Sequence, residues 1–325
     1  MRLRAVALLT ILVGILTAPL AAEAQQAGTA RRIGMVGPPE EPRFSEIRDA
    51  LRLGLREQGF AEPSTEILEA RTPRSDRARA AGAIEGLVRQ RVEVLFVIGS
   101  ALAKVVRQAS QLPVVFITPG DPVAAGLVAS LGRPGRNMTA ITFEYPELSG
   151  KRLELLHELV PSVKRVLVLY DPRDASPRQG LEAARAAASR LGLTLVEREV
   201  RTADDVTRSL DALTQADALL GIPGGLTTGH YVAMIQAAHA KGRPTVFHAR
   251  TESTAAALVT YGASDADVAR DAARSIAKIL RGADAGELPV QRPSKIAFVI
   301  NLKAAKALGL TIPPSLLLRA DQILE

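Results

Sequence analysis

Along most of the chain, the spacing of hydrophobic residues alternates between that of a buried strand and that of a helix. The short apolar run RIGMVG (32–37) has the composition of a buried strand, and Ile47, Leu51 and Leu55 then recur at helical spacing until Gly59. The same alternation of strand and helix continues through residues 65–71, 75–90, 92–98, 101–110 and 113–118. Strands separated by helices predict parallel βαβ units with right-handed crossovers.

A Gly- and Pro-rich segment, GRPGRN (132–137), separates this series from a second one. The second series predicts helices and strands at 147–160, 163–170, 178–191, 193–200, 203–214, 216–222, 229–241 and 244–247. Because a chain of 325 residues exceeds what one hydrophobic core usually supports, we interpret the two series as two α/β units.

Residues 92–122 and 216–253 resemble each other as a weak internal repeat. Each has a strand, a Gly-containing turn, a helix and a second strand, and LPVVF in the first is matched by RPTVF in the second. Shared rules of α/β architecture can produce one such pair by chance, so duplication is a hypothesis. It predicts two lobes whose strands direct their carboxyl ends to a common cleft, where open α/β sheets bind ligands.

The carboxyl ends of the predicted strands supply the candidate site. Four hydroxyl residues stand near the start of a predicted helix, namely Ser100, Ser176, Thr227 and Thr228. A hydroxyl there most often caps the helix, whereas several hydroxyls that converge on one cleft favour a small anion or zwitterion. Asp121 has two interpretations of equal weight, since it pairs with the amine of a ligand or caps a helix predicted over 122–131.

The amino terminus has the pattern of a secretory signal peptide. Arg2 and Arg4 precede an uncharged apolar run over 5–18, and an A-x-A pattern follows at 22–24. The run is shorter than the roughly 20 residues that cross a bilayer, which argues against a membrane anchor. We predict cleavage after Ala24 (signal peptide 1–24). Because the sequence has no Cys for lipid attachment, we expect a soluble periplasmic protein and not a lipoprotein.

Charge and composition exclude several classes of function. The formal net charge is +7, but bases are interspersed with acids and no array of aromatic and basic residues suits a nucleic acid. No nucleic-acid partner is therefore expected. The absence of Cys excludes disulfides, thiol catalysis and Cys-based metal sites.

The sequence lacks the motifs of common catalytic, nucleotide and metal sites. There is no G-x-S-x-G, G-x-x-x-x-G-K-[ST], G-x-G-x-x-G or H-E-x-x-H, and the His residues lack the spacing of a metal site. A hydrolytic pair of Ser100 and His248 would need hydrogen-bonding reach, for which the sequence gives no support. We expect no catalytic residue, no metal and no cofactor, and hence no enzyme.

The carboxyl-terminal sequence ELPVQRPSKIAFVINLKAAKALGLTIPPSLLLRADQILE (287–325) resembles the end of the ABC transporter substrate-binding protein family. Residues 121–142, 151–172 and 258–290 are similar to the same family, so the resemblance covers essentially the whole mature chain. It implies the type I periplasmic-binding fold, an α/β architecture of two Rossmann-like lobes with parallel sheets joined by three crossing segments. Such lobes close on a ligand.

The resemblance also implies how the chain is divided. Lobe 1 is expected to comprise 31–141 plus 262–283, and lobe 2 to comprise 142–261 plus 284–325. The crossings are expected near 139–145, 257–263 and 284–294. The closed form of a monomer would be recognised by an ABC permease, which with its ATPase would be a separate chain.

The ligand implied by the resemblance is a small molecule. Relatives are associated with amino acids, particularly aromatic ones, and with aromatic or other small organic acids. Four residues near predicted cleft loops favour a carboxylate, namely Arg173, Arg178, His248 and Arg250. The predicted ligand-binding residues are Phe44, Ser45, Gly99, Ser100, Ala101, Asp121, Tyr170, Arg173, Ser176, Gly224, Thr227, His248, Arg250 and Tyr261.

Three alternatives to an importer's receptor for a carboxylate stay open. A periplasmic sensory module that signals to a membrane receptor would use the same closure. A sugar-binding protein is less favoured because the sequence has no Trp on which a sugar ring would stack. A secreted hydrolase would need a nucleophile paired with a base.

Overall fold

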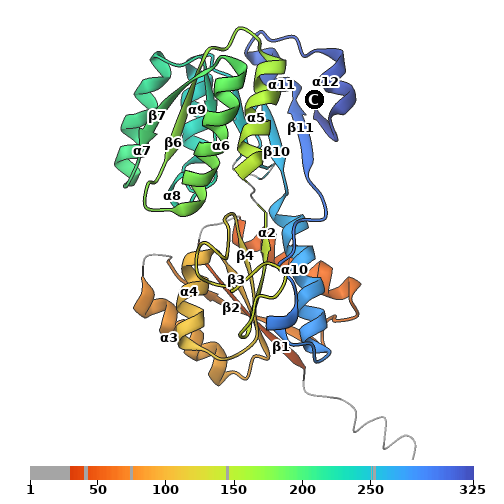
Figure 1. Cartoon of the computed structure of the whole chain (residues 1–325). Helices are drawn as coiled ribbons and strands as arrows, with labels where there is room; N and C mark the ends of the chain where they lie inside the picture. The colour runs from red at the N-terminus through yellow and green to blue at the C-terminus, as the bar shows by residue number, and fades with distance from the viewer. Residues whose placement is uncertain (1–29, 40–42, 74–75, 144–145, 250, 252–253) are drawn as a thin grey trace, which may run out of the picture.

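The computed structural model describes residues 30–39, 43–73, 76–143, 146–249, 251 and 254–325. They form two α/β lobes, one above the other in Figure 1, which confirms the predicted fold class. The predicted signal peptide (1–24) and Arg250 lie outside the described residues. Within those residues, no helix combines the length and the apolar character needed to cross a membrane.

The first lobe is built on a five-stranded parallel sheet with the strand order β2-β1-β3-β4-β5. Its strands are β1 (Arg31–Gly37), β2 (Thr65–Arg71), β3 (Val94–Ile98), β4 (Val114–Thr118) and β5 (Met138–Thr142). Its helices are α2 (Arg43–Glu57), α3 (Arg77–Arg89), α4 (Ser100–Ala109) and α10 (Asp265–Leu280). Strands β3, β4 and β5 are buried along their whole length because helices cover both faces of the sheet.

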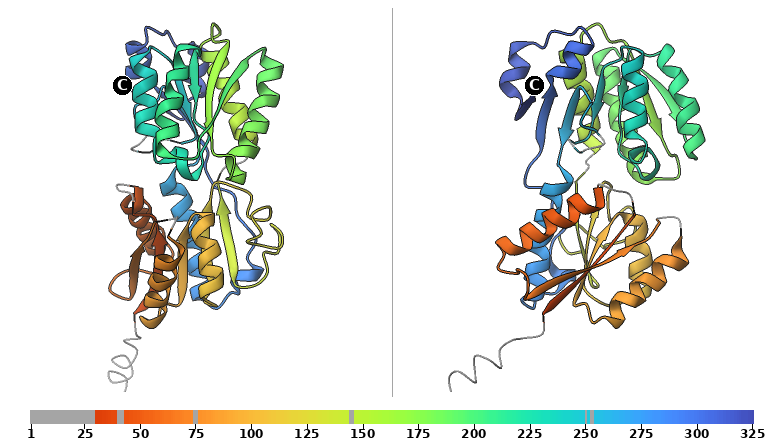
Figure 2. Two further views of the ribbon diagram at one scale, coloured as in Figure 1. Left: turned by 90° about the vertical axis from the view of Figure 1, so that its left-hand side faces the viewer. Right: turned by 180° about the vertical axis from the view of Figure 1, so that it is seen from behind.

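The two helix layers of this lobe come from distant parts of the chain. Helices α2 and α10 share one core, in which Ile47 and Leu51 belong to the same cluster as Val268 and Ile276. Figure 2 shows α10, in blue, beside α2, in orange-red. Helices α3 and α4 contribute to the core on the other face. The first lobe thus includes a helix from late in the chain.

The second lobe is built on a seven-stranded sheet with the order β12-β11-β10-β9-β8-β6-β7. Its strands are β6 (Arg165–Tyr170), β7 (Thr194–Glu199), β8 (Ala218–Leu220), β9 (Thr245–Phe247), β10 (Val259–Gly262), β11 (Ala297–Asn301) and β12 (Gln322–Leu324). Its helices are α5 (Pro146–Leu159), α6 (Ala175–Leu191), α7 (Ala203–Ser209), α8 (Gly225–Thr228), α9 (Tyr231–Ala240), α11 (Leu302–Ala307) and α12 (Pro314–Arg319).

One strand pair of this sheet departs from the parallel arrangement that the sequence predicts. Strand β11 is antiparallel to β10. The chain leaves β10 toward the first lobe, forms α10 there, and re-enters the second lobe from the side of the cleft. Because β10 ends where β11 begins, the two strands must run in opposite directions.

The predicted helix over 122–131 does not form. Residues 122–126 make turns, and Gly126 has φ +68, a left-handed conformation that interrupts a helix. The Asp121 carboxylate accepts hydrogen bonds from two backbone N–H groups of these turns, at 2.7 and 3.2 Å. Asp121 therefore has a local capping role, although in a turn and not in a helix.

The third crossing lies toward the end of the expected range 284–294. Residues 285–291, which follow the expected boundary at 284, are tied to the first lobe. The Gln291 backbone N–H donates to the Ala140 carbonyl of β5 at 2.9 Å. A Cβ at Gly286 would lie 2.0 Å from a backbone oxygen of this lobe, so the approach requires glycine. The chain crosses between Gln291 and β11.

Candidate functional site

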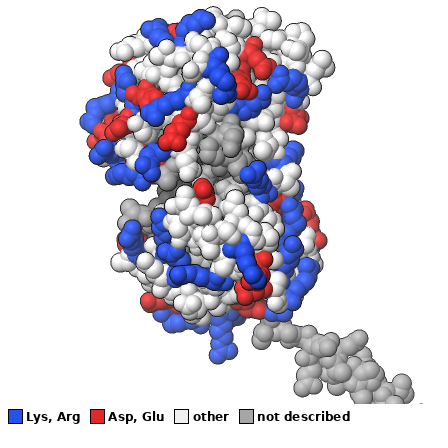
Figure 3. All heavy atoms as spheres, viewed as in Figure 1, with Lys and Arg blue, Asp and Glu red and all other residues white. Residues whose placement is uncertain are grey.

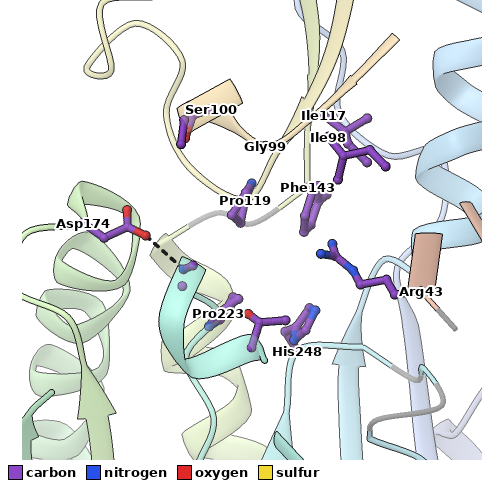
Figure 4. A pocket seen from close by; sticks show the side chains of 14 residues that line it. Arg43, Ile98, Gly99, Ser100, Ile117, Pro119, Phe143, Asp174, Pro223 and His248 are labelled. Carbon is purple, nitrogen blue, oxygen red and sulfur yellow. Dashed lines mark hydrogen bonds between the residues drawn. The ribbon is translucent and has the colours of Figure 1, made fainter. Parts of the chain in front are cut away.

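A pocket with a volume of about 90 Å³ lies between the two lobes (Figure 4). The first lobe contributes Arg43, Ile98, Gly99, Ser100, Ala101, Ile117, Pro119 and Phe143, and the second contributes Asp174, Pro223, Gly224, Gly225, Thr228 and His248. On the face of the molecule in Figure 3, basic and acidic side chains are interspersed over both lobes. The electrostatic character of the site therefore depends on the few charged groups that line the pocket.

The turn after β3 forms the wall of the pocket on the first lobe. Gly99 has φ +97, a conformation that favours glycine, and its N–H donates to the Ile117 carbonyl at 2.8 Å. Helix α4 begins at once with Ser100, and its cap, Gly99, has no side chain to accept from the first backbone N–H groups. The predicted residues Gly99, Ser100 and Ala101 all line the pocket.

The matching turn of the second lobe follows β8. A Cβ at Gly221 would lie 2.2 Å from the ring of Phe247, so only glycine lets the strand pass this ring. The chain then reaches Gly224 and Gly225, and the Gly225 N–H donates to Asp174 Oδ2 at 3.1 Å. The two turns that the weak repeat pairs thus face each other across one pocket, as that hypothesis requires.

Arg43 brings a guanidinium to the pocket from the first turn of α2. Its Nε donates to Asp265 Oδ2 at 2.6 Å and its Nη2 to Asp265 Oδ1 at 3.1 Å. Asp265 lies at the start of α10 and is 4% exposed. This two-point contact fixes the direction of the guanidinium plane.

His248 lines the pocket at the end of β9 and is 4% exposed. Burial, with a smaller contribution from the nearby Arg152 cation, lowers the pKa of His248 to about 3. Its Nδ1 is buried and accepts or donates no hydrogen bond within the described residues. His248 is therefore a neutral group that presents an imidazole to the pocket at pH 7.

Ser100 and His248 do not form a hydrolytic pair in this structure. Both line the pocket, but no hydrogen bond joins these two described side chains, and a group with so low a pKa is a weak base at neutral pH. Among the described residues, no three His, Asp or Glu side chains gather as metal ligands do.

Several predicted ligand residues lie away from the pocket because they serve the fold. Phe44 is 1% exposed and packs in the core of the first lobe, under the Arg71 guanidinium at 4.4 Å. Tyr170 donates its hydroxyl hydrogen to Glu199 at 3.3 Å, and Arg173 pairs with Asp171 at 2.7 Å. These polar groups satisfy neighbours on their own lobe.

Further predicted ligand-binding residues also lie away from the pocket. The buried Thr227 hydroxyl donates to the Ile222 carbonyl at 3.1 Å, and its neighbour Thr228 lines the pocket instead. The Tyr261 ring packs edge-to-face on Phe298 with centroids 6.3 Å apart. Ser45 and Asp121 do not line the pocket. Ser176 lies in α6, and its side chain is outside the description.

The sequence did not single out Arg43, Asp174 and Phe143, which all line the pocket. Arg43 and Asp174 are next in sequence to Phe44 and Arg173, which the sequence predicts as ligand-binding residues. Phe143 follows β5 directly. It is 4% exposed, so its ring belongs to the core and also closes one side of the pocket.

Comparison with known proteins finds that this chain is similar to binding proteins. The family model described as "ABC transporter substrate binding protein" matches residues 32–324. A "Tyrosine-binding protein" of Clostridioides difficile (strain R20291) is 21% identical over 282 residues, which cover 86% of this chain and 81% of that protein.

Solved structures show the same fold. The ABC domain from Streptococcus pneumonia in complex with L-Trp has a TM-score of 0.82 at 24% identity, with 91% of this chain and 100% of that chain covered. A conserved domain protein from Vibrio cholerae O1 biovar El Tor has a TM-score of 0.80 at 28% identity, with 91% and 99% covered. The two-lobed arrangement of the present chain is thus one that proteins of this kind share.

Proposed function

The chain belongs to the ABC transporter substrate-binding protein family, and we propose that it is the periplasmic receptor of an ABC importer for an amino acid with an aromatic side chain. The observation that carries this proposal is the chemistry of the pocket. Arg43 and Asp174 lie on opposite sides of it in Figure 4, and the apolar side chains of Pro119, Phe143 and Pro223 lie between them.

The charged groups suit the two ends of a zwitterion. The Arg43 guanidinium, held in one orientation by Asp265, can bind a carboxylate through charge-assisted hydrogen bonds. The start of α4 at Ser100 adds a hydroxyl and the positive end of a helix dipole on the same lobe. Asp174 offers a carboxylate to an ammonium group from the second lobe.

The apolar part of the pocket suits a flat side chain. Ile98, Ile117 and Phe143 form an apolar wall on the first lobe, and Pro119 and Pro223 lie in the view between the charged groups. An aromatic ring buries a large apolar area in such a slot. The relatives support this class of ligand, since one is named a tyrosine-binding protein and another holds L-Trp.

Binding of a ligand between the two lobes produces a conformation that a transporter can recognise. A ligand that contacts both turns favours the closed arrangement in proportion to its extra contacts there. We propose that a membrane permease, a separate chain, recognises the closed form and receives the ligand. The ligand leaves chemically unchanged, which mass spectrometry of the bound and released molecule would check.

The proposal includes export. Removal of the signal peptide 1–24 would leave a mature protein that begins at Gln25, in the periplasm and without a lipid anchor. Mass spectrometry of the protein purified from a periplasmic fraction tests this directly. A mature protein that retained Met1, or one found only in the cytoplasm, would contradict it.

A thermal-shift screen tests the ligand class. The panel comprises L-Trp, L-Tyr, L-Phe, 3-indolepropionate without the amine, tryptamine without the carboxylate, and neutral sugars. At 100 times its dissociation constant a ligand adds about 2.7 kcal/mol of stability. We expect the aromatic amino acids to raise the melting temperature most and tryptamine to have little effect. A shift with sugars alone would refute the proposal.

A further inference from the structure

Arg152 of α5 is the largest fully buried side chain among the described residues, with 0% exposure. A guanidinium in the interior is tolerated only where acceptors surround its N–H groups. Arg152 Nε donates to the Tyr261 carbonyl at 2.8 Å, and Nη2 donates to the His248 carbonyl at 3.4 Å. The two carbonyls stand at the ends of the neighbouring strands β10 and β9. Arg152 therefore holds two strand ends together on the side of the cleft.

The same place is where the chain crosses between the lobes. Gly262 ends β10, and Asp265 begins α10 of the first lobe. A Cβ at Gly262 would lie 1.7 Å from the His248 carbonyl oxygen and 3.2 Å from Arg152 Nη2. The crossing backbone, the His248 carbonyl and the guanidinium are thus packed together so closely that only glycine fits.

This crossing segment, residues 261–265, is attached at both ends to walls of the pocket. On the first lobe, its last residue, Asp265, holds Arg43 through the two-point ion pair. On the second lobe, Arg152 links Tyr261 to the backbone of His248. Arg43 and His248 both line the pocket, whereas Arg152 does not.

We propose that Arg152 is a positioning residue for ligand binding, which fastens His248 to the crossing segment 261–265 so that this wall of the pocket moves as one body with the hinge. This inference rests on the proposed function, because it assumes that closure of the lobes accompanies binding. Without Arg152, His248 would be free to shift relative to Arg43, and a ligand would have to order the two walls itself.

The protein is suited to a direct measurement of this coupling because its sequence contains no Cys. Two exposed positions, Gln108 in α4 and Gln236 in α9, can be changed to Cys and spin-labelled to report the distance between the lobes. The test variant is Arg152→Met. The matched control is Val166→Ala, which removes packing from the core of the second lobe and leaves both hydrogen bonds of Arg152 in place.

The ligand-free protein is measured first. We expect Arg152→Met to broaden the distribution of interlobe distances at least twofold, and Val166→Ala to leave it unchanged although its urea midpoint falls. We further expect Arg152→Met to bind L-Trp at least tenfold more weakly than Val166→Ala does. Equal distance distributions and equal affinities in the two variants would overturn the inference.

A second variant keeps the test decisive if Arg152→Met does not fold. Gly262→Ala drives a Cβ into the His248 carbonyl and is expected to disturb the same coupling, with the same two changes. The proposed function fails separately, since a wild-type protein that binds neither L-Trp nor L-Tyr would refute the ligand class. The ligand-free distances would still decide the role of Arg152 in that case.

Discussion

Arg43 of α2 and Asp265 of α10 form a two-point ion pair at the edge of the pocket, with Nε and Nη2 lying 2.6 and 3.1 Å from the two carboxylate oxygens. Asp265 is 4% exposed, and both this partner and the start of the helix that it occupies stabilise its negative charge. One contact therefore joins two helices of the first lobe and also orients the cation of the pocket.

Replacing Arg43 by Gln is expected to lower both stability and affinity. The change removes the Arg43 cation from a buried carboxylate, which costs about 3 kcal/mol in the free energy of unfolding. Loss of a charge-assisted contact to the ligand lowers the affinity for L-Trp by about tenfold or more. Urea unfolding and titration calorimetry measure the two effects.

Arg274→Gln is the matched control for this prediction. Arg274 pairs with Asp271, a carboxylate of α10 that is 1% exposed but does not line the pocket. This variant should lose stability and retain the affinity for L-Trp to within about twofold. If both variants lost affinity equally, the effect of Arg43 would be attributed to the fold and not to contact with the ligand.

Replacing Asp174 by Asn is expected to weaken binding with little change in stability. The Asn side-chain oxygen can still accept the Gly225 N–H, but the negative charge for an ammonium group is lost. The affinity for L-Trp should fall by about tenfold or more, whereas the affinity for 3-indolepropionate, which has no amine, should not fall. Asp204→Asn, at an exposed position in α7, is the control. A loss that is equal for both ligands would argue against an amine contact.

Burial of neutral His248 makes the protein less stable in acid. The pKa of His248 is lowered from 6.5 to about 3, so below pH 6.5 the unfolded chain takes up a proton that the folded protein does not. This contribution to stability is present above pH 6.5 and is lost as the pH falls toward 3. Between pH 7 and 4.5 the wild type should lose about 2 kcal/mol more than the His248→Gln variant. Urea unfolding at the two pH values measures the difference. Parallel losses would contradict an uncharged, buried imidazole.

Two glycine substitutions should change stability in opposite directions. At Gly221 a methyl group would lie 2.2 Å from the Phe247 ring, so Gly221→Ala should destabilise by about 2 kcal/mol and displace the turn that carries Gly224. At Gly82, inside α3, a methyl group meets nothing within 4 Å, and Gly82→Ala should stabilise by about 1 kcal/mol. Thermal unfolding of both variants tests the pair, and a destabilising Gly82→Ala would be inconsistent with this packing.

Much of the fold was predictable because the buried strands can be recognised by their apolar composition. The segments of β3 and β4 are apolar except for Thr118, and the turn after β3 holds Gly99 and Ser100, two predicted ligand-binding residues that line the pocket. The antiparallel β11 was not predictable from the alternation of elements, because its direction depends on which lobe the chain has just left.

The sequence could not predict which charged residues of a loop face the pocket, and the reason is physical. Arg173 and Asp174 are adjacent in one predicted loop, but Arg173 pairs with Asp171 on its own lobe while Asp174 faces the pocket. The direction of a side chain depends on partners distant in the sequence, as for Arg43, whose partner Asp265 comes from a late helix. Sequence patterns located the loops of the site, and tertiary packing selects among their residues.

The late position of α10, β11 and β12 in the chain has a consequence for biosynthesis. The ribosome has already released most of the first lobe when it begins to make α10, without which α2 lacks the other half of its core. The edge of the second sheet is finished only with β12, at Gln322–Leu324. A nascent chain of this protein therefore exposes apolar surface on both lobes until translation is almost complete.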